Sequence, residues 1–102
     1  MSTEQFTAVL AERIMGWRVC PDRFIKSGRT WIPRSRFRPL IKLEDAFLLL
    51  GRAAGSYRLT GAGNLFTAEV QIGVRAGKVS GEPKAWAITL AIAQALGIEG
   101  PQ

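Results

Sequence analysis

The sequence predicts an α+β fold with a small antiparallel sheet and three helices. Three segments place apolar residues at helical spacing, and one stretch between the second and third alternates with a period of two. The 102 residues have the length of one domain, and the apolar fraction of 47% is ordinary for a globular protein. Residues 1–102 are therefore expected to form a single domain.

The first segment, from about Thr3 to Met15, is predicted to be a helix. Ser2 and Gln5 have the spacing of a capping box, in which each side chain accepts a hydrogen bond from the other residue's backbone. Gly16 ends the regular pattern. The apolar side chains expected to face the core are Phe6, Val9, Leu10, Ile14 and Trp17.

Helical periodicity is lost between Trp17 and Pro39, where several residues favour turns. Short extended pieces are expected at Trp17–Val19 and Thr30–Ile32, where β-branched and aromatic residues cluster. The remainder is predicted to be a long basic loop covering about residues 18–42. The turn-favouring residues are Pro21, Gly28, Pro33 and Pro39.

A second helix is expected from about Lys42 to Ala54. Glu44 and Asp45 suit its positive N-terminal end, which favours this electrostatic role over metal binding or acid–base chemistry. Its predicted core stripe consists of Leu43, Phe47 and Leu50, widened by Leu48 and Leu49.

A β-hairpin should follow, with strands at Ser56–Thr60 and Leu65–Val74. The connection Gly61–Asn64 lies between two strands rather than before a helix, so we interpret it as a hairpin turn and not a phosphate-binding loop. Arg75–Lys78 is expected to be another turn, and Val79 to begin a short strand.

The last helix is predicted from about Glu82 to Leu96, with Gly97 at its C-terminal end. Its apolar residues extend around more than one side, so the helix is either deeply buried or contacts a second subunit. A homo-oligomer formed through residues 82–96 is one expectation. The main stripe contains Ala85, Ile88, Ala91, Ile92 and Ala95.

The net charge of +6 is concentrated in one part of the chain. Nine basic residues lie between Arg13 and Lys42 against one acidic residue, Asp22, which gives this segment a charge of +8. The rest of the chain carries −2. A concentrated positive charge indicates an anionic partner, either nucleic acid or an acidic protein surface.

Several chemistries are not expected. The chain has no histidine, so the commonest general base and metal ligand is absent. Its one cysteine, Cys20, can form neither an internal disulfide nor a cysteine-rich zinc site. We therefore predict a non-enzymatic protein without metal or cofactor. The N-terminal residues lack a signal-peptide pattern, and Ala85–Leu96 is too short to span a bilayer, which favours an intracellular protein.

The run Leu10–Trp17, Leu-Ala-Glu-Arg-Ile-Met-Gly-Trp, followed by a segment bearing Trp31 and Pro33, resembles small phage proteins of the phage ABA sandwich family. A helix beginning Glu-Asp-Ala-Phe at Glu44, then a hairpin and an alanine-rich helix, extends the resemblance over most of the chain. It implies a three-layer α/β/α sandwich and a phage or prophage protein in the bacterial cytoplasm, but little about function. Phe47 stands where the family pattern leads us to expect tryptophan.

The best candidate for a binding site is the arginine-rich aromatic segment. Guanidinium groups pair with phosphate or carboxylate, and aromatic rings stack on exposed bases. If the chain is extended here, Arg34, Arg36 and Arg38 would point to one side of a strand. The alternative is a solvated loop anchored by Trp31 and Phe37, and Trp31 itself is more typical of a core residue. The candidates are Arg29, Trp31, Arg34, Arg36 and Arg38, with Arg23, Lys26 and Lys42 as additional residues.

Three functions follow from these observations. The first is a phage accessory protein that occludes an acidic surface of a host defence nucleoprotein complex, as an anti-CRISPR protein does. The second is direct nucleic-acid binding through the basic segment. The third is a small structural homo-oligomer.

Overall fold

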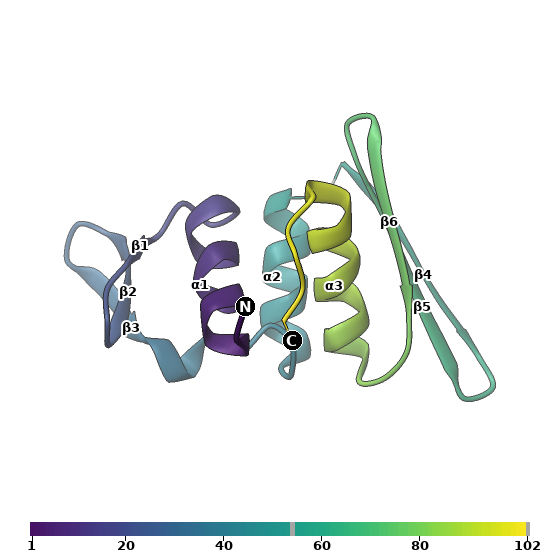
Figure 1. Ribbon diagram of the computed structural model, residues 1–102, viewed down its shortest axis with the longest axis horizontal. Coiled ribbons are helices and arrows are strands. Elements are labelled where there is room, and N and C mark those ends of the chain that lie inside the picture. The colour runs from purple at the N-terminus through teal and green to yellow at the C-terminus, as the bar shows by residue number, and fades with distance from the viewer. Residues whose placement is uncertain (54, 102) are drawn as a thin grey trace.

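Three helices lie between two antiparallel sheets in an elongated molecule of 42 × 27 × 23 Å (Figure 1). The computed structural model describes residues 1–53 and 55–101. Its helices are α1 (Thr3–Arg13), α2 (Leu43–Ala53) and α3 (Lys84–Leu96). The predicted α+β sandwich of three helices and antiparallel strands is confirmed. The strands, however, form two three-stranded sheets rather than one, and these sheets lie at opposite ends of the molecule.

The first sheet lies in the region predicted to be a long basic loop. It consists of β1 (Arg18–Val19), β2 (Arg23–Ser27) and β3 (Thr30–Pro33), in the order β1-β2-β3. The two extended pieces were predicted, but β2 was not, and the loop interpretation of residues 18–42 is wrong. Only Phe24 of β2 is fully buried, so this strand has too few apolar residues to produce a visible alternation.

An aromatic cluster attaches this sheet to α1. Trp17 lies with its ring centroid 4.9 Å from that of Phe37 and 6.0 Å from that of Phe24. Phe37 therefore anchors the segment to the core, which is the role that the alternative interpretation gave it. The capping box of Ser2 and Gln5 is also confirmed.

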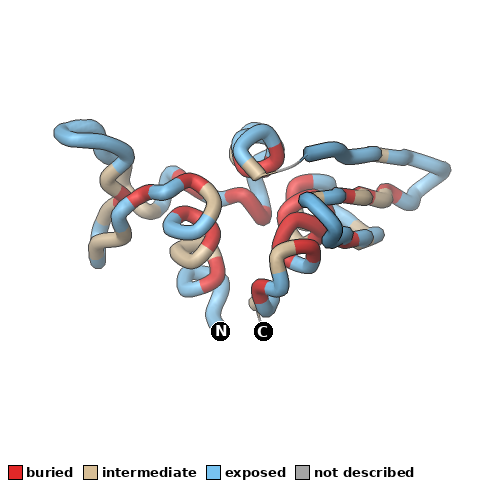
Figure 2. The backbone as a smooth tube through the Cα atoms, turned by 90° about the horizontal axis from the view of Figure 1, so that it is seen from above, coloured by how far each residue is buried: buried red, intermediate tan, exposed pale blue. Residues whose placement is uncertain are grey.

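Helix α2 buries only part of the stripe predicted for it. Ala46, Leu49 and Leu50 are buried, whereas Leu43 and Phe47 are about two-fifths exposed. The predicted core assignment is therefore confirmed for Leu49 and Leu50 and wrong for Leu43, Phe47 and Leu48. The cause is that α2 packs on α3 along one side, and its opposite side faces outward (Figure 2). Ala54, the predicted last residue of this helix, lies outside the described residues.

The second sheet contains β4 (Ser56–Ala62), β5 (Leu65–Ile72) and β6 (Arg75–Ser80) in that order. The predicted hairpin is confirmed, with its turn reduced to Gly63 and Asn64. The expected turn at Arg75–Lys78 is wrong, because the chain turns earlier, at Gly73, whose φ is +63°. Strand β6 is polar and lacks a clear apolar alternation, so its sequence did not indicate that it pairs with β5.

Helix α3 covers the inner face of β5 and β6 and packs on α2 on its other side. All five residues of its predicted stripe are buried. Thr89 is also fully buried and donates a hydrogen bond of 2.7 Å from Oγ1 to the carbonyl of Pro39. The broad apolar surface of α3 is thus accounted for by contacts within the chain. None of the helices within residues 1–53 and 55–101 has the length and apolar content of a membrane span.

Candidate functional site

The outer face of the β1–β3 sheet carries basic residues around an exposed tryptophan. Arg18 is opposite Ile25, which is opposite Trp31, so these side chains form one row across the three strands. Phe24, next to Ile25, points to the other face and is completely buried against the core. Because successive residues of a strand alternate, the row must face outward.

Arg23 lies on the same outer face, two residues from Ile25. Its guanidinium carbon is 4.2 Å from the centroid of the Trp31 ring, the distance of a cation–π contact. We call Arg18, Arg23, Ile25 and Trp31 the arginine–tryptophan platform. It is the place where the fold brings cationic and aromatic groups onto one exposed surface.

Trp31 is 48% exposed, so the expectation that it is a core residue is wrong. Tryptophan is a residue type often found in a core, but β3 contacts the core only through the face that bears Ile32. The register of the sheet then leaves Trp31 on the open face. Sequence alternation alone could not tell which face the helices would cover.

Asp22 neutralises part of the platform. Its carboxylate accepts hydrogen bonds from Arg23, the shortest being 2.8 Å from Nη2 to Oδ2. This hydrogen bond lowers the pKa of Asp22, and the attraction between the charges adds to the effect. The pair is solvent-exposed, so Arg23 remains accessible to a stronger anionic partner.

Two of the predicted residues lie at the β2–β3 end of the sheet. Arg29 is exposed in the turn between the strands, where Gly28 has a φ of +50°. Lys26 is exposed and its Nζ lies 5.3 Å from the centroid of the Trp17 ring. Arg29 can therefore extend the positive surface at the tip, while Lys26 partly covers the aromatic cluster.

The predicted alignment of Arg34, Arg36 and Arg38 along a strand is wrong. Residues Arg34–Arg36 form a single 3-10 turn, η1, in which side chains rotate around an axis instead of alternating. Arg36 is exposed, whereas Arg34 points inward and donates hydrogen bonds of 3.3 Å to the carbonyls of Cys20 and Glu4. Arg34 thus joins η1 to the residue that follows β1 and to α1.

Arg38 and Lys42 lie farther along the chain, next to the start of α2. The backbone N–H of Arg38 donates to Asp45 Oδ2 at 2.9 Å, and the carbonyl of Lys42 accepts from the N–H of Asp45. Both side chains are exposed, but they lie near the helices in the middle of the molecule and not on the β1–β3 sheet. The structure therefore divides the eight predicted residues among the sheet, η1 and the α2 start. Sequence reasoning did not select Arg18, because its proximity to Trp31 depends on strand pairing.

Replacing Arg34 by alanine should lower the free energy of unfolding by about 1–2 kcal/mol, because two carbonyls lose a charged donor. The control Arg36→Ala, on the same turn, should change stability by less than about 0.5 kcal/mol. Urea denaturation followed by circular dichroism measures both. Equal stability of the two variants would contradict the structural role of Arg34.

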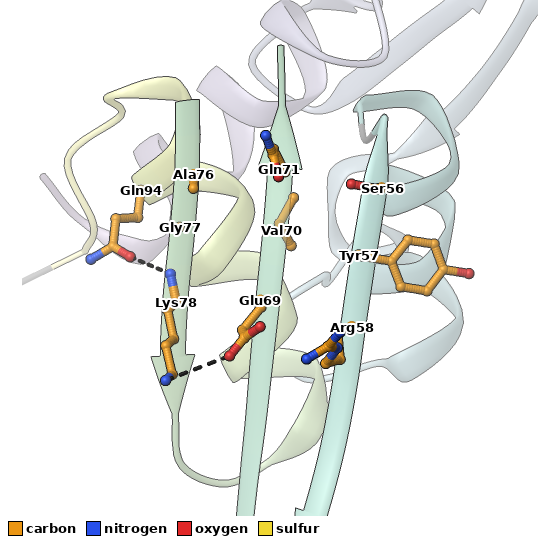
Figure 3. A pocket seen from close by; sticks show the side chains of 10 residues that line it. All are labelled: Ser56, Tyr57, Arg58, Glu69, Val70, Gln71, Ala76, Gly77, Lys78 and Gln94. Carbon is orange, nitrogen blue, oxygen red and sulfur yellow. Dashed lines mark hydrogen bonds and ion pairs between the residues drawn. The ribbon is translucent and has the colours of Figure 1, made fainter. Parts of the chain in front are cut away.

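Two hollows on the surface carry both signs of charge. One, of about 510 Å³, lies between α1 and η1 and includes Glu4, Asp22 and Arg38. The other, of about 640 Å³, lies on the second sheet, where Arg58, Glu69 and Lys78 share one row (Figure 3). The Lys78–Glu69 pair, at 3.5 Å, offsets the charge there. Neither hollow is lined by a tryptophan, whereas the platform places an arginine over one.

In the described part of the chain, no group of three or more histidine, cysteine or acidic side chains is placed to hold a metal ion. Cys20 is a free, half-buried thiol. The absence of enzymatic activity and of a cofactor remains a prediction.

The fold is similar to that of a phage protein from Bacillus cereus ATCC 14579, known from a 2.0 Å crystal structure. The two superpose with a TM-score of 0.71 over 93% of this chain and 92% of the other, at 18% sequence identity. At this identity the likeness concerns the fold. No protein-family model matches the sequence, and no curated protein matches it either.

Proposed function

We propose that this chain is a non-enzymatic phage or prophage accessory protein that binds single-stranded nucleic acid through the arginine–tryptophan platform. The observation that carries the proposal is the exposed Trp31, held by the Arg23 guanidinium 4.2 Å from its ring centre and in one row with Arg18. The shared fold with a phage protein supports the proposed origin.

The platform suits an unpaired strand for two physical reasons. An exposed aromatic face can stack on any base, whereas bases in a duplex are already stacked on each other. Arg23, which lies over the ring, and Arg18, two strands away in the same row, can contact phosphates next to a stacked nucleotide. Arg29, at the tip of the sheet, can extend the electrostatic contact along the strand.

The proposal is tested by the anisotropy of a labelled single-stranded oligonucleotide titrated at several salt concentrations. With about three phosphates contacted, the plot of log affinity against log salt should have a slope near −2. The slope of the Arg18→Ala/Arg23→Ala double variant should be less negative, because fewer phosphates are contacted. Arg58→Ala, which removes an exposed arginine from the other sheet, is the control and should leave it unchanged. Absence of binding at low salt would refute the proposal.

Replacing Asp22 by asparagine should increase the affinity for the oligonucleotide by about threefold to tenfold. The substitution removes the carboxylate that occupies Arg23, so a phosphate no longer competes with it. Because the pKa of Asp22 is lowered, the wild-type carboxylate stays ionised at neutral pH, and acidification should raise affinity only when the pH falls through that lowered pKa. The same titration measures the effect, and a loss of affinity in Asp22→Asn would contradict it.

A second candidate is inhibition of a host defence nucleoprotein complex in the bacterial cytoplasm, with an acidic protein surface as partner. Tryptophan and arginine, the two residue types of the platform, are enriched at the energetic centres of protein interfaces. Affinity capture from infected cells, with and without nuclease, separates the two candidates. A protein partner that survives nuclease treatment would favour the inhibitor.

A further inference from the structure

Strand β4 forms a long, regular edge of the second sheet. Within the described residues it pairs with β5 on one side only, and its seven residues continue in register from Ser56 to Ala62 without a bulge. All but Leu59 are exposed. Soluble proteins usually protect such an edge by proline, by a bulge or by several charged side chains, and β4 has only the single charge of Arg58.

The opposite edge of the same sheet is protected. The backbone N–H of Lys78 on β6 points away from β5 and donates to Oε1 of Gln94 on α3 at 2.6 Å. Helix α3 packs on β5 and β6, which leaves β4 beyond its cover. The difference between the two edges indicates that β4 is the one available for pairing.

The hydrogen-bonding groups of β4 alternate in direction. The hairpin closes with Ala62 opposite Leu65 around a two-residue turn, so Ala62 and every second residue before it bond to β5. The N–H and C=O groups of Tyr57, Leu59 and Gly61 must then point out of the sheet. Three residues thus present unpaired donors and acceptors at this edge.

We propose that β4 pairs with β4 of a second copy of this chain, antiparallel and centred on Leu59, to join the two sheets into one continuous sheet. A two-fold axis at Leu59 places Leu59 opposite its own copy and Tyr57 opposite Gly61 of the other chain. In this register all three outward-facing residues of each chain exchange hydrogen bonds. The surface is complementary to itself, as an isologous dimer requires.

The charge on β4 favours the same register. Arg58 is its only charged residue, and centring the pair on Leu59 puts Arg58 opposite Thr60 of the other copy. A shift that centres the pair on Arg58 would place two arginines directly opposite each other, which is unfavourable. A shift in the other direction, to Thr60, leaves Tyr57 beyond the paired residues and forms fewer hydrogen bonds.

The inner face supplies apolar contact in the same arrangement. Tyr57 is 54% exposed and lies in the inner row with the buried Val70 and Gly77, beyond the cover of α3. Pairing would lay its ring over Gly61 of the other copy, a contact in which an aromatic side chain covers the exposed backbone of a strand glycine. Leu59 would contact its symmetry mate next to it.

The dimer is tested by size-exclusion chromatography with light scattering, from low micromolar to near-millimolar chain concentration. The wild-type mass should rise towards twice that of one chain. In the Thr60→Lys variant, a lysine of each chain lies opposite Arg58 of the other chain. These two repulsive pairs should raise the dissociation constant about tenfold. Thr60→Glu, which creates two opposite-charge pairs, should lower it about threefold.

The matched controls are Ala76→Lys and Ala76→Glu, at an exposed position on the outer face of β6, and they should leave the dissociation constant unchanged. Circular dichroism of each variant verifies folding. If the Thr60→Glu variant stays monomeric over the whole concentration range, the proposal is overturned. A strand of another protein would then be the expected partner of this edge. A dimer insensitive to both Thr60 substitutions would overturn it in favour of a different surface.

Discussion

Replacing Gly77 by alanine should lower the free energy of unfolding by about 3 kcal/mol. Gly77 lies in the inner row of β6, where the backbone of α3 approaches so closely that an added Cβ would collide with the carbonyl oxygen of Ala91 and lie 2.9 Å from the nitrogen of Ala95. Backbone atoms of a packed helix cannot rotate away as a flexible side chain can. The helix must therefore move off the sheet, which opens the core that it shares with β5.

The control for this substitution is Gly51→Ala. Gly51 is an exposed position inside α2, and an added Cβ would meet no atom within 4 Å. Alanine has the higher helix propensity, so this variant should gain up to about 1 kcal/mol. Thermal and urea denaturation of the two variants should thus give shifts of opposite sign. A Gly77→Ala protein as stable as wild type would contradict the close packing of α3 on β6.

Replacing Trp31 by alanine should weaken binding of a single-stranded oligonucleotide by about tenfold or more. The substitution removes the exposed ring on which a base can stack and the surface against which Arg23 is held. Trp31→Phe keeps an aromatic face and should retain most of the affinity. Fluorescence anisotropy at constant salt measures all three proteins.

The folded state should be little changed by these substitutions at Trp31, because the side chain is about half exposed and outside the buried aromatic cluster. Urea denaturation provides this check. Arg58→Ala on the second sheet is again the matched control for binding. If Trp31→Ala binds as tightly as wild type while the arginine variants lose affinity, the contact is purely electrostatic and the stacking role is wrong.

The sequence predicts elements well where short-range signals are strong. The capping box at Ser2, the alternation through Phe66, Ala68 and Val70, and the alanine-rich stripe of α3 are each confirmed by the structure. It fails at β2 and β6, because each has few apolar residues and no clear alternation. It also fails on α2, where several leucines compete for one buried side.

The candidate site was predicted in part. The concentration of positive charge between Arg13 and Lys42 is a property of the chain itself. The platform needs Trp31 on the open face and Arg18 two strands away from it in the same row, which strand register alone provides. Arg34 has the same charge as Arg36, but its guanidinium donates hydrogen bonds to the backbone carbonyls of Cys20 and Glu4.

By itself, the sequence determined the helices, the main hairpin and the segment that carries the charge, because capping, periodicity and composition act between residues close in the chain. The tertiary structure alone decided which face of each strand is covered, which arginines stay free and which sheet edge stays open. The physical reason is that burial depends on contacts between elements distant in sequence. A tryptophan or an arginine is the same residue in either environment until those elements pack.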